Sequence, residues 1–161
     1  MIENMWRIDI GATSKVLPNE IVEAQCEFLK KATGGNVTAK VSEYQGNIFA
    51  DEGGFGNNFT FEFFITSPYL PNYKFRVFIM QYDVGFYPLK LQLEHDITTE
   101  VLEIKGYEMR LMFAEHGEYF SCQCEEEFKR TLSDILNSQR VNMVIENINL
   151  IALREDEKMP F

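Results

Sequence analysis

Two histidines and three cysteines are the side chains in this sequence best suited to proton transfer or nucleophilic attack near neutral pH. His95 stands between two acidic residues at the end of a predicted strand, a position typical of a solvated turn histidine. His116 follows Glu115 and precedes Cys122 and Cys124, an order that suggests a thiolate and imidazole pair. An enzyme or small-ligand carrier built on this pair would place its pocket between sheet and helices near His116.

The residues that follow these cysteines argue against such chemistry. Glu125, Glu126 and Glu127 come directly after Cys124, and their negative charges disfavour a thiolate. A Cys-x-Cys pair with one upstream histidine also falls short of the four ligands of a structural zinc site, and the spacing of Cys26 does not complete the set. The sequence therefore predicts no catalytic residue, no metal site and no cofactor, and the protein is more simply a non-enzyme.

A stretch rich in glycine and asparagine runs from residue 46 to residue 58, and its composition predicts a turn or a mobile loop. Asp51 and Glu52 precede the glycines of this stretch. The lysine and the Ser or Thr of a phosphate-binding loop do not follow, and the acidic residues lack the spacing of an EF-hand. We therefore expect an acidic loop here and no nucleotide site.

The charge of the chain points to a class of partner. The formal net charge is −10 at pH 7 for 161 residues, a sign that repels phosphate backbones and attracts basic proteins. Two acidic groups are the candidate binding residues, and they lie on the loop and at the start of a predicted helix: Asp51, Glu52, Glu125, Glu126 and Glu127. The simpler alternative is that these groups keep the protein soluble and complement a helix dipole.

Targeting features predict where the chain works. No apolar run reaches the length of about 18 residues that a membrane-spanning helix needs, so no membrane is expected as a partner. The first residues lack the basic start and apolar stretch of a secretion signal. An odd number of cysteines favours reduced thiols. Together these features predict a cytoplasmic protein.

Period-two alternation in the middle of the chain predicts its strands. Residues 59–65, 73–79 and 87–93 are three β-rich runs separated by short breaks that contain proline or glycine. Such breaks are too short for a crossover helix, so the strands should pair as an antiparallel meander. Further strands are expected at 6–10, 37–41 and 107–113.

The second face of this predicted sheet is only partly polar. Phe64, Phe78 and Met80 fall on it if alternation is strict, beside polar residues such as Lys90. A helix packed on that face is one explanation. Self-association of the chain through these three apolar side chains is the other.

Helical spacing predicts the remaining elements. Apolar residues recur with that spacing from 18 to 33, and a short helix is expected at 97–103. Two more helices are expected, one that begins near residue 125 and one that begins after Ser138, which is its predicted N-cap. The charged end, 154–161, should fray.

These elements predict one α+β domain over residues 1–161. It should contain an antiparallel sheet of about five or six strands, with the N-terminal helix and two C-terminal helices packed on one face. The preferred function is a non-catalytic, acidic module that binds a basic protein, as an antitoxin or immunity protein does. The alternatives are the small-ligand carrier or enzyme near His116 and a self-associating assembly subunit.

Overall fold

The computed structural model describes residues 1–8, 15–45, 59–114 and 117–158 of the chain. Within these ranges the chain folds into one six-stranded antiparallel sheet and a layer of helices. The helices are α1 (Pro18–Ala32), α2 (His95–Leu102), α3 (Glu125–Leu136) and α4 (Gln139–Lys158). The predicted α+β class is therefore confirmed.

The sheet has the strand order β1-β2-β3-β4-β6-β5. Its first four strands are β1 (Thr38–Glu43), β2 (Phe59–Ser67), β3 (Leu70–Tyr82) and β4 (Leu89–Leu93), and each pairs antiparallel with the next. The predicted meander is thus confirmed for the three central runs. The order then reverses, because β6 (Gly117–Cys122) pairs with β4 and leaves β5 (Leu111–Ala114) at the edge.

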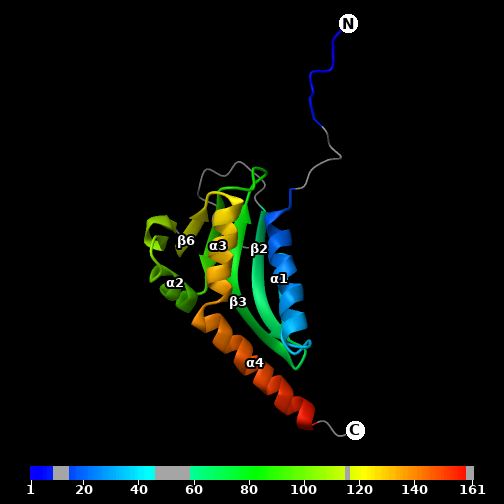
Figure 1. Cartoon of the computed structure of the whole chain (residues 1–161), viewed down its shortest axis with the longest axis vertical. Helices are drawn as coiled ribbons and strands as arrows, with labels where there is room; N and C mark the ends of the chain where they lie inside the picture. Colours follow the sequence, from blue (N-terminus) through cyan, green and yellow to red (C-terminus); the bar gives the residue numbers. More distant parts are fainter. Residues whose placement is uncertain (9–14, 46–58, 115–116, 159–161) are drawn as a thin grey trace.

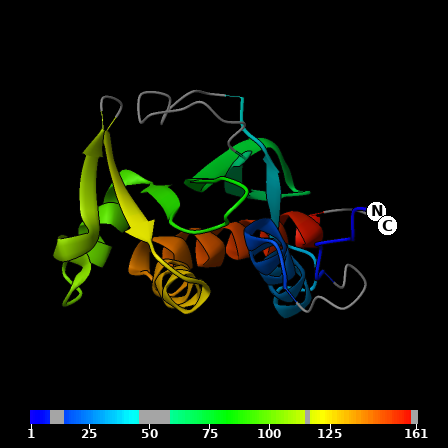
Figure 2. The same ribbon diagram turned by 90° about the horizontal axis from the view of Figure 1, so that it is seen from above.

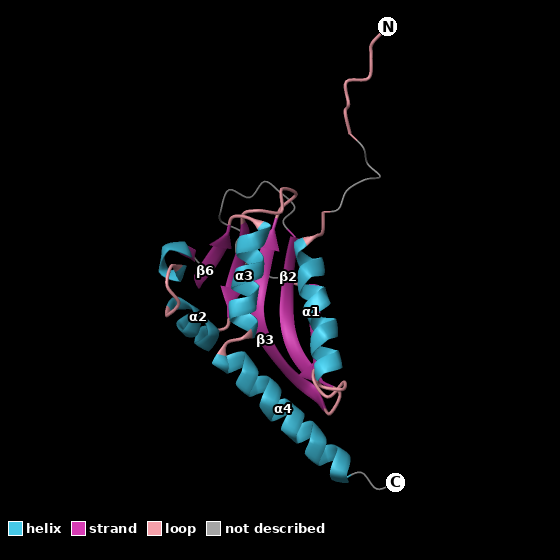
Figure 3. Ribbon diagram, viewed as in Figure 1, coloured by secondary structure: helices cyan, strands magenta, loops and turns pink. Residues whose placement is uncertain are grey.

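Three helices cover a single face of the sheet. Figure 1 shows α1, α3 and α4 in front of the strands, and Figure 2, turned by 90°, places all three on the same side. Figure 3 shows the same two layers coloured by secondary structure. Buried side chains from both layers form one core, among them Val22 of α1, Phe128 and Ile135 of α3, and Val141 and Ile148 of α4. This arrangement agrees with the predicted packing on one face.

An irregularity in β3 changes which of its residues meet the helices. Phe63 lies opposite Phe78, but the next residue, Phe64, lies opposite Arg76, so β3 contains one extra residue between these pairs. Such a bulge reverses the in-and-out alternation of the strand. As a result Phe78 and Met80 face the helices, together with Phe63.

The predicted self-association surface is therefore wrong. Phe78 and Met80 are 1% and 0% exposed in the core beneath the helices. Phe64 lies on the opposite face of the sheet, where it contacts Lys74. These three side chains do not share a surface, because strict alternation cannot reveal an inserted residue.

The region before β6 also differs from its prediction. The alternation at 107–113 predicts one strand, but Tyr107–Arg110 form a 3-10 helix, η1, and only Leu111 onward is extended. Strand β6 is not predicted at all. Two consecutive residues of β6, Tyr119 and Phe120, are both buried, on opposite faces of the sheet. The strand therefore lacks the alternation of polar and apolar residues.

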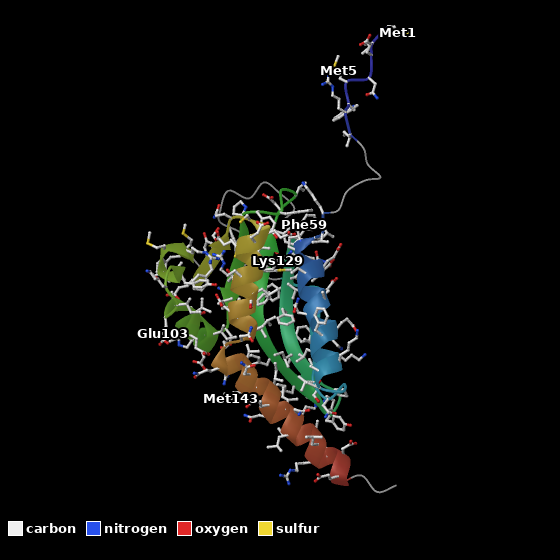
Figure 4. All side chains as sticks on the ribbon, in the orientation of Figure 1. Met1, Met5, Phe59, Glu103, Lys129 and Met143 are labelled. Carbon is white, nitrogen blue, oxygen red and sulfur yellow. The ribbon has the colours of Figure 1, made fainter. Side chains whose placement is uncertain are left out.

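At both ends of the chain the structure differs from the predictions. Residues 1–8 have no regular structure, so the predicted strand at 6–10 is absent from its described part, and residues 9 and 10 lie outside the described ranges. Figure 4 shows Met1 and Met5 far from the folded body. The predicted frayed tail is helical as far as Lys158. Good helix formers extend α4 there, and the Tyr69 hydroxyl donates a hydrogen bond to Asp156 at 3.2 Å.

Helix α1 buries only part of the stripe that helical spacing predicts. That spacing puts Ile21, Phe28 and Leu29 on one apolar face, yet Phe28 is exposed. The helix instead packs through Val22, which is fully buried, and through Ile21, Cys26 and Leu29. The stripe is shifted because β1 lies beneath the side of the helix that carries Val22.

Candidate binding surfaces

The start of α1 and the start of α3 lie at the same end of the helix layer (Figure 1). Each helix has glutamates in or near its first turn, Glu20 and Glu23 on α1 and Glu125 and Glu126 on α3. The turn between β3 and β4, which begins with Asp83, joins the strand ends beneath them. We call these five residues, Glu20, Glu23, Asp83, Glu125 and Glu126, the acidic rim.

Two tyrosines on either side of that turn report how close the carboxylates are. Burial raises the pKa of Tyr82, and the charges of Glu20 and Glu23 raise it further. Burial likewise raises the pKa of Tyr87, where charges that include Glu125 and Glu126 add to the effect. Carboxylates from two different helices therefore act electrostatically on the tyrosines at the two ends of one short turn.

The three glutamates predicted as binding residues divide into two groups. Glu126 is exposed, and Glu125 is half-buried with Lys129 at 3.5 Å in an i, i+4 ion pair. Glu127 turns inward, where its Oε1 lies 2.8 Å from Nε of Arg110. Glu127 is thus part of the internal structure, and only the first two belong to the acidic rim.

A shallow groove separates α1 from α3 just below the rim. Its volume is about 320 Å³, at the small end of ligand sites. Ile21 of α1 and Leu132 and Leu136 of α3 give it an apolar floor, and Lys129 lies on its wall. A groove of this size has room for one or two apolar side chains beneath a ring of carboxylates.

The opposite face of the sheet, which the described helices leave uncovered, has the reverse character. Its positive side chains lie over aromatic rings: Lys74 is 4.5 Å from the centre of Phe64, Arg76 5.7 Å from that of Tyr44, and Lys90 5.4 Å from that of Tyr119. Cations placed in this way shield an apolar surface through their stems and attract the ring faces. We call this surface the open face.

One carboxylate lies among the cations of the open face. Glu62 forms an ion pair with Lys74 and another with Arg76, the latter at 3.7 Å, although its own side chain is only 9% exposed. A groove of about 800 Å³ begins beside this cluster and is bordered by β3, β4, β6 and the start of α2. Cationic and acidic groups both line it, among them Arg76, His95 and Glu118.

A polar cluster holds η1 against α3. Arg110 donates from Nη2 to Thr131 at 2.8 Å and to the Cys122 sulfur at 3.2 Å, and from Nε to the Ser121 carbonyl at 3.3 Å. Its guanidinium also lies 4.8 Å from the centre of the Tyr107 ring. Each of these contacts is internal, so Arg110 fixes η1 in place.

In the same cluster Cys122 is fully buried, a setting that disfavours its thiolate. Burial raises its pKa to about 11, although Arg110 and Thr131 act in the opposite direction. A thiol of that kind is protonated at neutral pH. Cys124 is exposed at the N-cap of α3, and Cys26 is half-buried with its pKa raised to about 11 by burial and by Glu23 and Glu27.

The remaining residues that the sequence suggested for a site are described only in part. Asp51, Glu52 and His116 fall outside the described residues. His95 is exposed as the first residue of α2. Among the residues that the structure describes, no group of three His, Cys, Asp or Glu side chains could hold a metal ion. In the same part of the chain, no helix has both the length and the apolar character to cross a membrane.

Sequence reasoning missed three of the five residues of the acidic rim, Glu20, Glu23 and Asp83. Glu20 and Glu23 follow Pro18 at the start of a correctly predicted helix, just as Glu125 and Glu126 start α3. A glutamate in a first turn was therefore a visible signal on both helices. What the sequence does not reveal is that the two helix starts lie side by side.

Comparison with known proteins does not extend this picture. A scan against protein-family models, a search of curated proteins and a search of solved structures each find no match for this chain.

Proposed function

We propose that this protein is a non-catalytic module that binds a basic segment of another protein at the acidic rim. The observation that carries the proposal is the convergence of carboxylates from α1, α3 and the β3–β4 turn on one end of the helix layer. A single acidic helix start is explained by its dipole. Two such starts beside an acidic turn create a field that favours a cationic partner.

The groove below the rim suggests the shape of that partner. Its apolar floor, formed in part by Ile21 and Leu136, fits an apolar side chain, while the rim above it fits lysine or arginine. A basic amphipathic segment has both features. Its cations would compete with Lys129 for Glu125, and this exchange costs little because exposed ion pairs contribute less than about 1 kcal/mol.

The distribution of charge supports the same choice of surface. The chain has a net charge of −10, yet Lys74, Arg76 and Lys90 lie together on the open face. The acidic excess is therefore concentrated elsewhere, including the helix side. A basic partner is attracted to the rim and repelled by the cations of the open face. These charges therefore orient the partner toward the rim as it approaches.

A second candidate function rests on the groove of about 800 Å³ on the open face, whose volume lies within the range of small-molecule sites. This groove is bordered by the start of α2 and by Gly117. Small-ligand binding in it is the alternative function.

The test is capture of partners from the native cell extract at low and high salt with three forms of the protein. The rim variant is Glu20→Lys with Glu126→Lys, one exposed carboxylate from each helix. The control is Glu146→Lys with Glu157→Lys, two exposed carboxylates on α4 that change the net charge equally. Bound proteins are identified and quantified by mass spectrometry.

We expect the wild type and the control to retain one stoichiometric basic protein that high salt releases. The rim variant should lose at least about ten-fold of it, since each reversed charge removes an attraction and adds a repulsion. Equal loss in the control would show that net charge alone drives binding. A wild-type preparation without any partner would overturn the proposal.

A further inference from the structure

Strand β5 forms an edge of the sheet, with β6 on one side and no described strand on the other. Edge strands present unpaired backbone groups, and proteins usually protect them with charges, prolines or a covering element. The sequence of β5, Leu111–Ala114, contains neither a charged residue nor a proline. In Figure 2 this strand is the outermost one, at the far left.

Large apolar side chains project from this edge. Met109 is 83% exposed, Met112 46% and Phe113 73%. Their exposure does not come from a loose segment, because Arg110 is bonded to Thr131 and Ser121 on either side of the core. These bonds fix the backbone from which the exposed side chains extend, which lowers the entropy lost when a partner binds.

We propose that β5 pairs with β5 of a second copy of this chain, in antiparallel orientation about a two-fold axis, so that the two sheets become continuous. The strand is self-complementary in the register that places Met112 opposite Met112 of the second copy. In that register Phe113 lies opposite Leu111 of the other copy, since directly opposed residues share a face. Apolar side chains of the two copies then lie beside each other on both faces of the new strand pair.

Charge also favours a second copy as the occupant. Two chains of net charge −10 repel each other unless they meet where neither is strongly acidic. Strand β5 satisfies this, because none of its residues is charged and its exposed side chains, Met112 and Phe113, are apolar. It also lies at the opposite end of the strand order from β1, against which α1 packs, so pairing keeps Glu20 and Glu23 of the two copies far apart.

The available area indicates how strong the pairing is. At roughly 200 Å² for a large side chain, the three exposed residues supply roughly 400 Å² per copy. A stable interface of standard size needs about 800 Å² per partner. The backbone edge and its neighbours must supply the remainder, so we expect a dissociation constant in the micromolar range, about 1–100 μM.

The first test is sedimentation of the full chain over a range of concentrations, with two matched variants. Phe113→Glu places a charge at the edge, and Phe28→Glu places the same charge on the exposed side of α1. We expect a concentration-dependent dimer for the wild type and for Phe28→Glu, and at least about a ten-fold weaker one for Phe113→Glu. A wild type that remains monomeric at about 1 mM would overturn the proposal, and so would a dimer that only Phe28→Glu disrupts.

The second test examines the register in a Cys124→Ser background, which removes the exposed native thiol. Met112→Cys should form a disulfide-linked dimer under mild oxidation, because opposed Cβ atoms in a sheet are about 5 Å apart. Met143→Cys is the control, since Met143 on α4 (Figure 4) is exposed to the same degree, 45% against 46%. Equal cross-linking of both variants would contradict the pairing, whereas preferential cross-linking at 112 would support it. Neither test depends on the basic partner.

Discussion

The two faces of the sheet use the same residue types for opposite purposes. Under the helices, aromatic side chains such as Phe78 and Phe63 pack on each other, with ring centres 5.1 Å apart, and are removed from water. On the open face, Phe64 and Tyr44 lie beneath positive side chains that stay half-exposed. An aromatic residue in this sheet therefore contributes either to the core or to a charged surface, according to its face.

This difference teaches where the chain's net charge comes from. The open face contains several cations, and Glu62 is held among two of them. The rim at the starts of α1 and α3 contains carboxylates, and Glu125 among them forms an ion pair with Lys129. The net charge of −10 is therefore unevenly distributed, because the rim is acidic whereas the open face carries both cations and carboxylates.

The largest expected effect separates the two faces by their stability. Phe78→Ala should lower the free energy of unfolding by about 3–5 kcal/mol, because it leaves a cavity among fully buried side chains. Phe64→Ala should cost about 1 kcal/mol, since it removes one ring contact with Lys74 from a half-exposed position. Urea denaturation of both variants measures the difference. Equal losses of unfolding free energy in the two variants would contradict the bulge in β3, which puts Phe78 and Phe64 on opposite faces.

A smaller effect is expected on the helix-covered face of the sheet, where stability should depend on pH through Cys122. The thiol of Cys122 has its pKa raised from 9.0 to about 11 by burial. Between these values the unfolded chain loses a proton that the folded chain keeps, so stability present below pH 9 is lost as the pH rises toward 11. The loss from this thiol should be about 2 kcal/mol.

The matched variant for this prediction is Cys122→Ser, compared with the wild type across the same pH range. Tyr82 and Tyr87 also have raised pKa values, so they lower stability at alkaline pH in both proteins. Only the difference in unfolding free energy between the wild type and Cys122→Ser therefore reports on Cys122. The gap in unfolding free energy should narrow by that amount between pH 9 and pH 11. A gap that stays constant would mean that the thiol is accessible to water.

Local sequence patterns predicted most of the fold. Alternation located β2, β3 and β4, and the acidic first turn and apolar stripe located α3, because these signals depend on residues close together in the chain. Ser138 caps α4 as predicted, accepting from the backbone N–H of Val141 at 3.2 Å. Patterns failed where a distant partner decides: at the bulge in β3, which changes the face of Phe78, and at β6, which is buried on both sides.

The acidic rim could be predicted only in part for the same reason. Glu125 and Glu126 were identified from their position before an apolar stripe. Their proximity to Glu20 and Glu23 follows from α1 and α3 lying side by side on the sheet, about 100 residues apart in the chain, and no short pattern encodes such packing. Glu127 looked identical to its neighbours, but Arg110 of η1 draws it inward.

The most direct test of binding at the acidic rim is to map, by NMR on the isotope-labelled protein, where a basic peptide binds. A basic amphipathic peptide with lysines and leucines at helical spacing would be titrated at low and at physiological salt. The account predicts shifts of the backbone amides at the starts of α1 and α3 and in the β3–β4 turn, weakening with salt, and none on the open face beside Lys74 and Arg76. Shifts scattered over every acidic residue, or concentrated along α4, would contradict the claim that the acidic rim is the binding surface.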